Sequence, residues 1–264
     1  MSIEISNLSV SFGSRPILSD VGLTARPGQL TAIVGPNGSG KTTLLKALAG
    51  DLAFSGDIRI NGVALSAMKP WQAAVHRAVL PQSTTLSFPY TVREIVRLGL
   101  MSGRSGVRDD EAVHLPDKAL ARVDLAGFAG RYYQELSGGE QQRVQLARVL
   151  CQVWRPVLDG MPRYLLLDEP VSSLDIKHQL IIMNIAAAFA AAGGGVIAVL
   201  HDLNLTAQFA DHVAMMHRGR LAAAGSVSDV LTDALVSDVF ECRIRIGATP
   251  ANGGPFVLPQ AAQA

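Results

Sequence analysis

A glycine-rich segment near the N-terminus has the residue types and the spacing of a phosphate-binding loop. Residues 35–42 read Gly-Pro-Asn-Gly-Ser-Gly-Lys-Thr and fit the pattern G-x-x-x-x-G-K-[ST]. Glycines at these positions let backbone N–H groups turn toward phosphate oxygens, and the helix that follows presents its positive end. An apolar run precedes the segment and a helical pattern follows it, which favours a nucleoside triphosphate site over an ordinary glycine-rich turn.

The polar members of this segment have separate expected roles. The Lys41 ammonium is expected to reach the β- and γ-phosphates, and the Thr42 hydroxyl is expected to bind Mg²⁺. The residues predicted to bind the nucleotide here are Gly35, Pro36, Asn37, Gly38, Ser39, Gly40, Lys41, Thr42 and Thr43.

Two adjacent acids end an apolar strand pattern in the second half of the chain. The run Tyr164–Leu167 is followed by Asp168 and Glu169. A buried parallel strand delivers the residues at its end to the carboxyl edge of the sheet, where a phosphate loop also lies. We expect Asp168 to hold Mg²⁺, directly or through water, and Glu169 to act as general base on an attacking water. A strand that ends in Asp-Glu is often only a solvated edge, so this reading depends on the phosphate loop.

A third segment, Ser137-Gly138-Gly139-Glu140, has the pattern of a capped helix start. Ser137 is expected to cap a helix that begins near Glu140 and to leave free N–H groups as a second anion-binding position. In isolation this segment would be read as an ordinary helix start.

Together, the three segments resemble those of the ATP-binding subunits of ABC transporters, and the resemblance extends over nearly the whole chain. It implies that Gln82 contacts the metal and the attacking water, and that His201 contacts the γ-phosphate. Asp175, in the segment Ser172–Asp175, matches a loop that crosses the dimer interface. Phe12 stands where the family stacks an aromatic ring on adenine, although Tyr is commoner there. The predicted catalytic residues are Glu169, His201 and Gln82, and the predicted Mg²⁺ ligands are Thr42, Gln82 and Asp168.

The same resemblance implies that ATP lies between two copies of the chain. Ser137 and Gly139, with Gly138 and Glu140 beside them, would contact the nucleotide that the opposite subunit holds. Because the chain has one phosphate loop and one such segment, a homodimer with two shared sites is expected. The family also implies integral membrane permease subunits, a periplasmic solute-binding protein that acts indirectly, and a peripheral position on the cytoplasmic face of the bacterial inner membrane.

Two further segments indicate the kind of transporter. Arg77–Gln82 followed by Phe88–Val96 resembles importers of heme, ferric siderophores and vitamin B12. The connection Cys151–Arg163, which contains Trp154 and Pro156, is longer than the family norm and resembles that of bacterial heme-import ATPases. The sequence therefore predicts an ATP hydrolase that energises heme uptake, with a ferric-siderophore or vitamin B12 importer as the alternative.

Composition bears on the remaining classes of protein. The 264 residues are 48% hydrophobic and 17% charged, which indicates a folded globular chain. A formal net charge of +1 without clustered Lys and Arg predicts no nucleic-acid partner. A soluble ABC ATPase of translation or DNA repair would be expected to carry paired cassettes, coiled-coil inserts or basic arms. A binding module without catalysis would be expected to lose Glu169 or His201, and both are present.

The elements that must position these residues alternate between strand and helix, which predicts an α/β fold. The expected architecture is a P-loop NTPase core with a parallel sheet, an N-terminal antiparallel β subdomain and an inserted α-helical subdomain. Residues 1–82 and 158–264 are assigned to the core, and residues 83–157, with Ser137–Glu140, to the helical subdomain. Strands are predicted at 30–34, 57–60, 77–80, 164–167, 196–200 and 213–216, and helices at 41–49, 91–100, 109–123, 176–192 and 203–210.

One stretch, Ile181–Leu200, has no charged residue and approaches the length of a membrane span. Gly193–Gly195 divides it, so a helix followed by a buried strand is expected instead.

Overall fold

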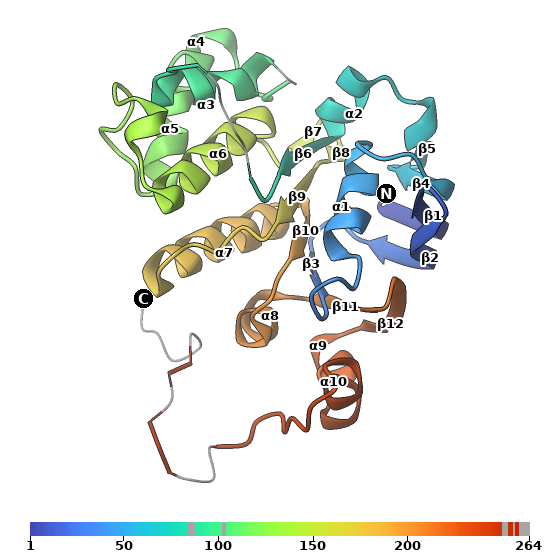
Figure 1. The fold of residues 1–264 in the computed structure, drawn as a ribbon. Coiled ribbons are helices and arrows are strands. Elements are labelled where there is room, and N and C mark those ends of the chain that lie inside the picture. The colour runs from blue at the N-terminus through green and yellow to red at the C-terminus, as the bar shows by residue number, and fades with distance from the viewer. Residues whose placement is uncertain (84–87, 102–103, 250–252, 256, 259–264) are drawn as a thin grey trace.

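Six strands form the central sheet, in the order β12-β11-β3-β10-β9-β6 (Figure 1). The structure is a computed structural model that describes residues 1–83, 88–101, 104–249, 253–255 and 257–258. The strands are β3 (Leu30–Val34), β6 (Arg77–Leu80), β9 (Tyr164–Asp168), β10 (Gly195–Val199), β11 (His212–His217) and β12 (Arg220–Gly225). All neighbouring strands run parallel except β11 and β12. The predicted α/β core with a parallel sheet is confirmed.

A second, four-stranded sheet is antiparallel and has the order β2-β1-β4-β5. Its strands are β1 (Ile3–Phe12), β2 (Arg15–Ala25), β4 (Ser55–Ile60) and β5 (Val63–Ala64). The alternating apolar residues of β1 are buried, as the sequence pattern predicts. Asn61 and Gly62 join β4 to β5 with φ angles of 52° and 84°, the left-handed conformation that a tight hairpin turn requires.

The central sheet is buried on both faces, because alternate residues of each strand enter different cores. On β9, Leu165 and Leu167 belong to the core that holds the helices α3, α5, α6 and α7, whereas Tyr164 and Leu166 belong to the core shared with α1 and the antiparallel sheet. Near-continuous apolar strands are what a sheet covered on both sides needs. Figure 1 shows α1 on one side of this sheet and α7 on the other.

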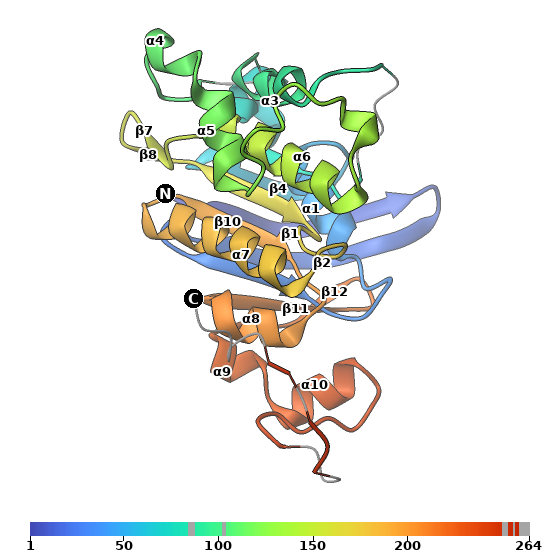
Figure 2. The ribbon, with the colours of Figure 1, turned by 90° about the vertical axis from the view of Figure 1, so that its left-hand side faces the viewer.

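The helices between β6 and β9 gather beside the sheet (Figure 2). They are α3 (Val92–Met101), α4 (Asp109–Ala112), α5 (Leu115–Arg122), the short 3-10 turn η2 (Tyr133–Glu135) and α6 (Gly138–Gln152). The prediction of one helix over 109–123 is wrong, since α4 ends at Ala112 and α5 begins at Leu115. Pro116 explains the break: it has no N–H to donate to Ala112, and its ring would clash with that carbonyl in a continuous helix. Residues 84–87 and 102–103 of the predicted helical subdomain lie outside the described residues, and its boundaries stay a prediction.

The long connection between α6 and β9 contains a small hairpin. Strands β7 (Val157–Leu158) and β8 (Met161–Pro162) pair across Asp159 and Gly160, which have φ angles of 51° and 76°. Directly after it, the buried Arg163 donates to the carbonyls of Ser105 and Gln152 and to that of Arg104. The guanidinium therefore joins the hairpin to the loop before α4, and burial lowers its pKa to about 10.

The remaining helices include several that the sequence pattern did not predict. The predicted helices are α1 (Lys41–Ala49), α7 (Ile176–Ala191) and α8 (Leu203–Phe209), and the additional ones are η1 (Leu65–Ala67), α2 (Pro70–His76), α9 (Val227–Val230) and α10 (Asp233–Val239). The last two are short, and each begins at a capping hydroxyl, Ser226 or Thr232. No helix among the described residues is long and apolar enough to cross a bilayer.

The close approach of α3 and α6 predicts a stability change at Gly99. A Cβ at this position would lie 2.0 Å from the carbonyl oxygen of Arg148, so Gly99→Ala must push the helices apart. We expect a loss of about 1–3 kcal/mol of unfolding free energy, opposite in sign to the gain of roughly 1 kcal/mol that alanine brings to an uncrowded helix. Thermal unfolding measures it. Gly130→Ala is the control, because a Cβ there meets nothing within 4 Å. An equal melting temperature for both variants would contradict the packing argument.

Candidate functional site

The register of the parallel strands brings the predicted site residues to one edge of the sheet. Val199 of β10 lies opposite Ile33 of β3 and opposite Asp168 of β9, so the ends of the three strands are level. The phosphate loop continues from β3, and His201 follows β10 by two residues. Leu80 of β6 pairs with Leu167 of β9, and therefore Gln82 and Glu169 both stand two residues beyond the same level.

The phosphate loop is closely packed from behind by neighbouring backbone and side-chain atoms. A Cβ at Gly35 would lie 2.1 Å from the carbonyl oxygen of Met216, and one at Gly40 would lie 2.6 Å from the Leu18 side chain. The φ angles of 146° and 103° at these two glycines also favour glycine. The N–H of Gly219 donates to the carbonyl of Ser39 at 3.0 Å and fastens the loop to the turn between β11 and β12.

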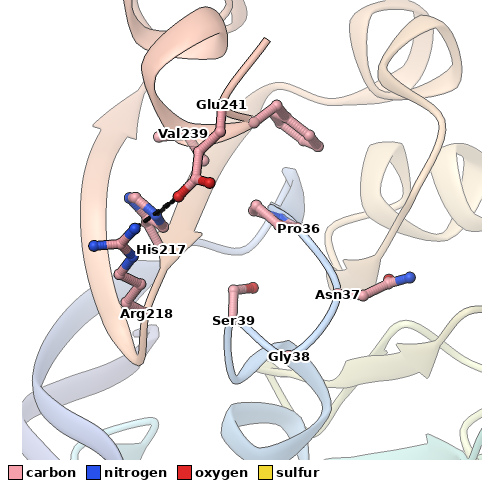
Figure 3. A pocket seen from close by; sticks show the side chains of 9 residues that line it. Pro36, Asn37, Gly38, Ser39, His217, Arg218, Val239 and Glu241 are labelled. Carbon is pink, nitrogen blue, oxygen red and sulfur yellow. Dashed lines mark hydrogen bonds and ion pairs between the residues drawn. The ribbon is translucent and has the colours of Figure 1, made fainter.

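Figure 3 shows the outer side of this loop, where α10 ends. A cavity of about 290 Å³ lies between Pro36–Ser39 and the residues that follow α10. Glu241 forms an ion pair with Arg218 at 2.7 Å and lies 3.9 Å from His217. Ser39 is 2% exposed, and its hydroxyl, which points into the curve of the loop, has no hydrogen-bond partner among the described residues. A buried hydroxyl of this kind fits a loop that binds an anion.

Lys41 begins α1 and turns its ammonium back over the loop. Its Nζ donates to the carbonyls of Gly35 at 2.8 Å and Pro36 at 2.9 Å. Since an ammonium has three donors, one remains for a phosphate oxygen. Burial lowers the pKa of Lys41, and the charges of Glu169 and Asp168 partly offset that effect.

Thr42 and Asp168 form the pair that could hold a magnesium ion. The Thr42 hydroxyl donates to Oδ1 of Asp168 at 3.1 Å. Two ligands of Mg²⁺ in octahedral geometry lie about 3 Å apart, because each metal–oxygen distance is about 2.1 Å. The separation and the oxygen chemistry of this pair therefore fit the ion. Asp168 points to the α1 face of the sheet, as do Tyr164 and Leu166 before it.

Two of the residues predicted for catalysis, Gln82 and His201, both contact the third, Glu169. Gln82 donates its amide to Oε2 of Glu169 at 2.9 Å, and Nε2 of His201 lies 2.6 Å from Oε1 of the same carboxylate. The Glu169 side chain is 14% exposed, so few waters compete for its oxygens. Both oxygens of the predicted base thus have a fixed partner, which orients the carboxylate as a general base requires.

A cavity of about 340 Å³ opens in front of the phosphate loop. It is lined by Phe12, Arg15, Ile17, Asn37, Gly38, Gly40, Lys41, Thr42, Thr43, Glu169 and His201. Phe12 is 56% exposed, which leaves its ring available for a planar base. Arg15 and Ile17 were missed by sequence analysis, because only the hairpin of β1 and β2 brings them beside the loop. Gln82 does not line this cavity and reaches the site through Glu169.

The segment Ser137–Glu140 lies apart from that cavity. Ser137 caps α6: its hydroxyl oxygen accepts from the Glu140 N–H at 3.4 Å, and the Glu140 carboxylate accepts from the Ser137 N–H at 2.8 Å. The predicted cap is confirmed. A Cβ at Gly139 would lie 2.9 Å from the Leu174 side chain, so glycine permits the start of α6 to lie close to the segment Ser172–Asp175.

Asp175 also lies outside the cavity. Its carboxylate caps α7, accepting from the His178 N–H at 2.9 Å. The nucleotide contacts predicted for Asp175 and for Ser137–Glu140 require a second copy and stay predictions.

Comparison with known proteins gives consistent matches. Residues 18–172 match the family model described as ABC transporter. The chain is 67% identical to a hemin import ATP-binding protein (HmuV) of Mesorhizobium japonicum, over 98% of each sequence. It is 60% identical to the protein of that name from Rhizobium meliloti, over 98% of this chain and 99% of the relative.

Solved structures share the fold. An ATP-binding subunit of an ABC transporter superposes with a TM-score of 0.77 at 24% identity, over 94% of this chain and 96% of the other. A dimeric bacterial ABC transporter cassette gives a TM-score of 0.73 at 25% identity, over 85% of this chain and 98% of that one. A bacterial Atm1-family ABC exporter with ATP bound gives a TM-score of 0.76 at 26% identity, over 94% of this chain and 42% of the exporter.

Burial of Asp168 predicts how its neutral replacement changes stability. Asp168 is 2% exposed, and burial raises its pKa, with a further rise from Glu169 and partial offsets from Thr42, Lys46 and Lys41. Because the folded pKa lies above the unfolded one, stability is lost as the pH rises through the folded value. In the presence of a metal chelator and the absence of nucleotide, we expect Asp168→Asn to melt a few degrees higher than wild type near neutral pH. Each kcal/mol of added unfolding free energy raises the melting temperature of a chain of this size by about 2–4 °C.

The pH dependence separates this effect from general stabilisation. The gain of Asp168→Asn is expected to disappear in acid, where the wild-type carboxyl is protonated in both states. Asp238→Asn, an exposed position in α10, serves as the control and should match wild type at each pH. A lower melting temperature for Asp168→Asn than for wild type near neutral pH, with no difference in acid, would show that ionised Asp168 stabilises the fold and would contradict this expectation.

Proposed function

The chain belongs to the ABC transporter family, and from this premise we propose that it is the ATP-hydrolysing subunit of a bacterial hemin importer. Its relatives at 60–67% identity over nearly full length are named hemin import ATP-binding proteins. The single observation that carries catalysis is the Glu169 carboxylate, fixed between Gln82 and His201 beside the cavity of the phosphate loop.

The residues around that cavity perform hydrolysis as follows. The loop N–H groups, Lys41 and the positive end of α1 bind the β- and γ-phosphates, and Phe12 stacks on the adenine. Glu169 takes a proton from water as the water oxygen bonds to the γ-phosphorus and the bond to the β–γ bridging oxygen breaks, which yields ADP and phosphate. His201 contacts the γ-phosphate and orients the base. Thr42 and Asp168, with Gln82 as a further predicted ligand, would hold Mg²⁺, which would neutralise charge on the phosphates.

A second copy of the chain completes each site in this proposal. Ser137 caps α6, which begins at Gly138, and the start of a helix favours an anion. Residues Ser137–Glu140 do not line the cavity around Lys41 of their own chain. We assign them to the γ-phosphate of the partner's ATP, with Asp175 at the dimer interface. ATP then closes the dimer and hydrolysis releases it.

The transporter context supplies the remaining partners. Because the described residues include no helix that could span a bilayer, translocation requires separate permease subunits. We place the chain on the cytoplasmic face of the inner membrane, bound to such a permease. A periplasmic solute-binding protein delivers hemin to the opposite side.

Replacement of the base tests the catalytic assignment. Glu169→Gln keeps the size and shape of the side chain but replaces one carboxylate oxygen with an NH2 group and cannot accept a proton. ATP binding is therefore expected to persist while turnover falls roughly 10²–10⁴-fold. Steady-state phosphate release and binding of a fluorescent ATP analogue measure the two properties. Glu111→Gln, in α4 and outside the cavity, is the matched control. Near-wild-type turnover in Glu169→Gln would remove Glu169 from the base role.

Reconstitution tests the transported substrate. The chain would be co-purified with its permease, placed in proteoliposomes and supplied with binding protein loaded with hemin, a ferric siderophore or cobalamin. We expect only the hemin-loaded binding protein to stimulate phosphate release and to deliver its cargo. Stimulation by either of the other two, without stimulation by hemin, would contradict the assignment. Failure to copurify with any polytopic membrane protein would contradict the transporter proposal itself.

A further inference from the structure

A glutamine side chain of α6 forms a hydrogen bond with the backbone of Glu169, the predicted general base. The amide of Gln142 donates from Nε2 to the main-chain carbonyl of Glu169 at 2.9 Å. Gln142 lies one turn beyond Gly138, so the same first turns of α6 carry both this contact and the segment Ser137–Glu140. The sequence pattern around Gln142 does not predict this contact, because the two residues are far apart in the chain.

The residue that receives this hydrogen bond has an unusual backbone. Glu169 has a φ angle of 50°, in the left-handed region that non-glycine residues adopt only at a cost. Such a conformation persists when surrounding contacts fix it, and it is concentrated at functional sites. The backbone after β9 turns here, and the turn determines where the Glu169 side chain begins.

Three donors share the Glu169 carbonyl. Ser172 donates its backbone N–H at 3.3 Å and its hydroxyl at 3.2 Å, and both groups belong to the loop that Glu169 itself begins. The Gln142 bond, at 2.9 Å, is the shortest of the three, and it originates in a different element. Gln142 is therefore the residue through which α6 fixes the position of the Glu169 backbone.

We propose that Gln142 is a positioning residue for hydrolysis, which holds the backbone of Glu169 in the conformation that directs its carboxylate to the attacking water. The proposal rests on the role of Glu169 as general base. Gln142 touches neither nucleotide nor water in this assignment and acts only through Glu169. Loss of its donor should leave the binding of ATP intact, because the phosphate loop and Phe12 are held by other contacts.

The same helix provides a matched comparison. Gln152, at the other end of α6, also donates its side-chain amide to core carbonyls, those of Ala74 and Arg77, each at 2.9 Å. Both glutamines thus fasten α6 to the core, but Gln152 does so far along the helix from Glu169. A role in stability alone would make the two equivalent.

The experiment compares Gln142→Met, Gln142→Glu and Gln152→Met in the full chain. Methionine keeps the approximate length of glutamine without a donor, and glutamate keeps its shape but presents a carboxylate. The melting temperature, the affinity for a non-hydrolysable ATP analogue, KM for ATP and kcat are measured for each variant beside wild type and Glu169→Gln.

We expect both Gln142 variants to lower kcat roughly tenfold to a hundredfold, the loss that misplacement of a catalytic group by up to about 1 Å produces. Their KM and analogue affinity should remain within a factor of about two of wild type. Gln152→Met should lose melting temperature to a similar extent and retain kcat. This split between kcat and KM is one that a purely structural contact would not produce.

Two results would overturn the proposal. One is a kcat for the Gln142 variants equal to that of Gln152→Met, and the other is a loss confined to nucleotide affinity. The Glu169→Gln control distinguishes failure of the premise: if that variant hydrolyses ATP at the wild-type rate, the base assignment is wrong, whereas an inactive Glu169→Gln beside fully active Gln142 variants rejects the positioning role alone.

Discussion

The register of three neighbouring parallel strands is the constraint on which the site depends. Because Val199 is level with both Ile33 and Asp168, the phosphate loop, His201 and the Asp168-Glu169 pair all leave the sheet at the same height. Burial of both faces of the sheet fixes this register, since a slip of one residue would exchange the side chains of the two cores. The same alternation sends Asp168 toward Thr42 on α1, so the apolar residues of β9 determine where its terminal carboxylate lies.

The charged groups at this edge are placed where water is scarce, and this makes them responsive to a ligand. Burial lowers the pKa of Lys41 and raises that of Asp168, so each resists its own charged form. A polyanion that accepts from Lys41 and a cation that binds Asp168 would favour the charged form of both groups. Burial of these two groups therefore lowers the stability of the unliganded fold and strengthens the binding of a ligand that neutralises them, as in other preorganised sites.

Helix α6 connects this edge to the remainder of the molecule. Its first turn holds Ser137–Glu140, its next turn reaches the Glu169 carbonyl through Gln142, and its last turn is tied to the core by Gln152. Its packing against α3 depends on a glycine at position 99. One rigid element thus links the proposed contact with the partner's nucleotide to the geometry of the base in its own chain.

Sequence by itself determined the fold class, most of the strands and helices of the core, and the identity of the nucleotide loop, because glycine spacing, apolar alternation and capping residues act over a few neighbouring positions. It failed at 109–123, where Pro116 interrupts a periodic pattern. Only the tertiary structure decided that Gln82 and His201 hold the two oxygens of Glu169, that Arg15 lines the cavity, and that Gln142 contacts the base. Gln82 lies 87 positions from Glu169 in the chain, and Gln142 lies 27 positions from it. A local sequence pattern covers only a few neighbouring residues and cannot predict which distant side chains the fold brings into contact.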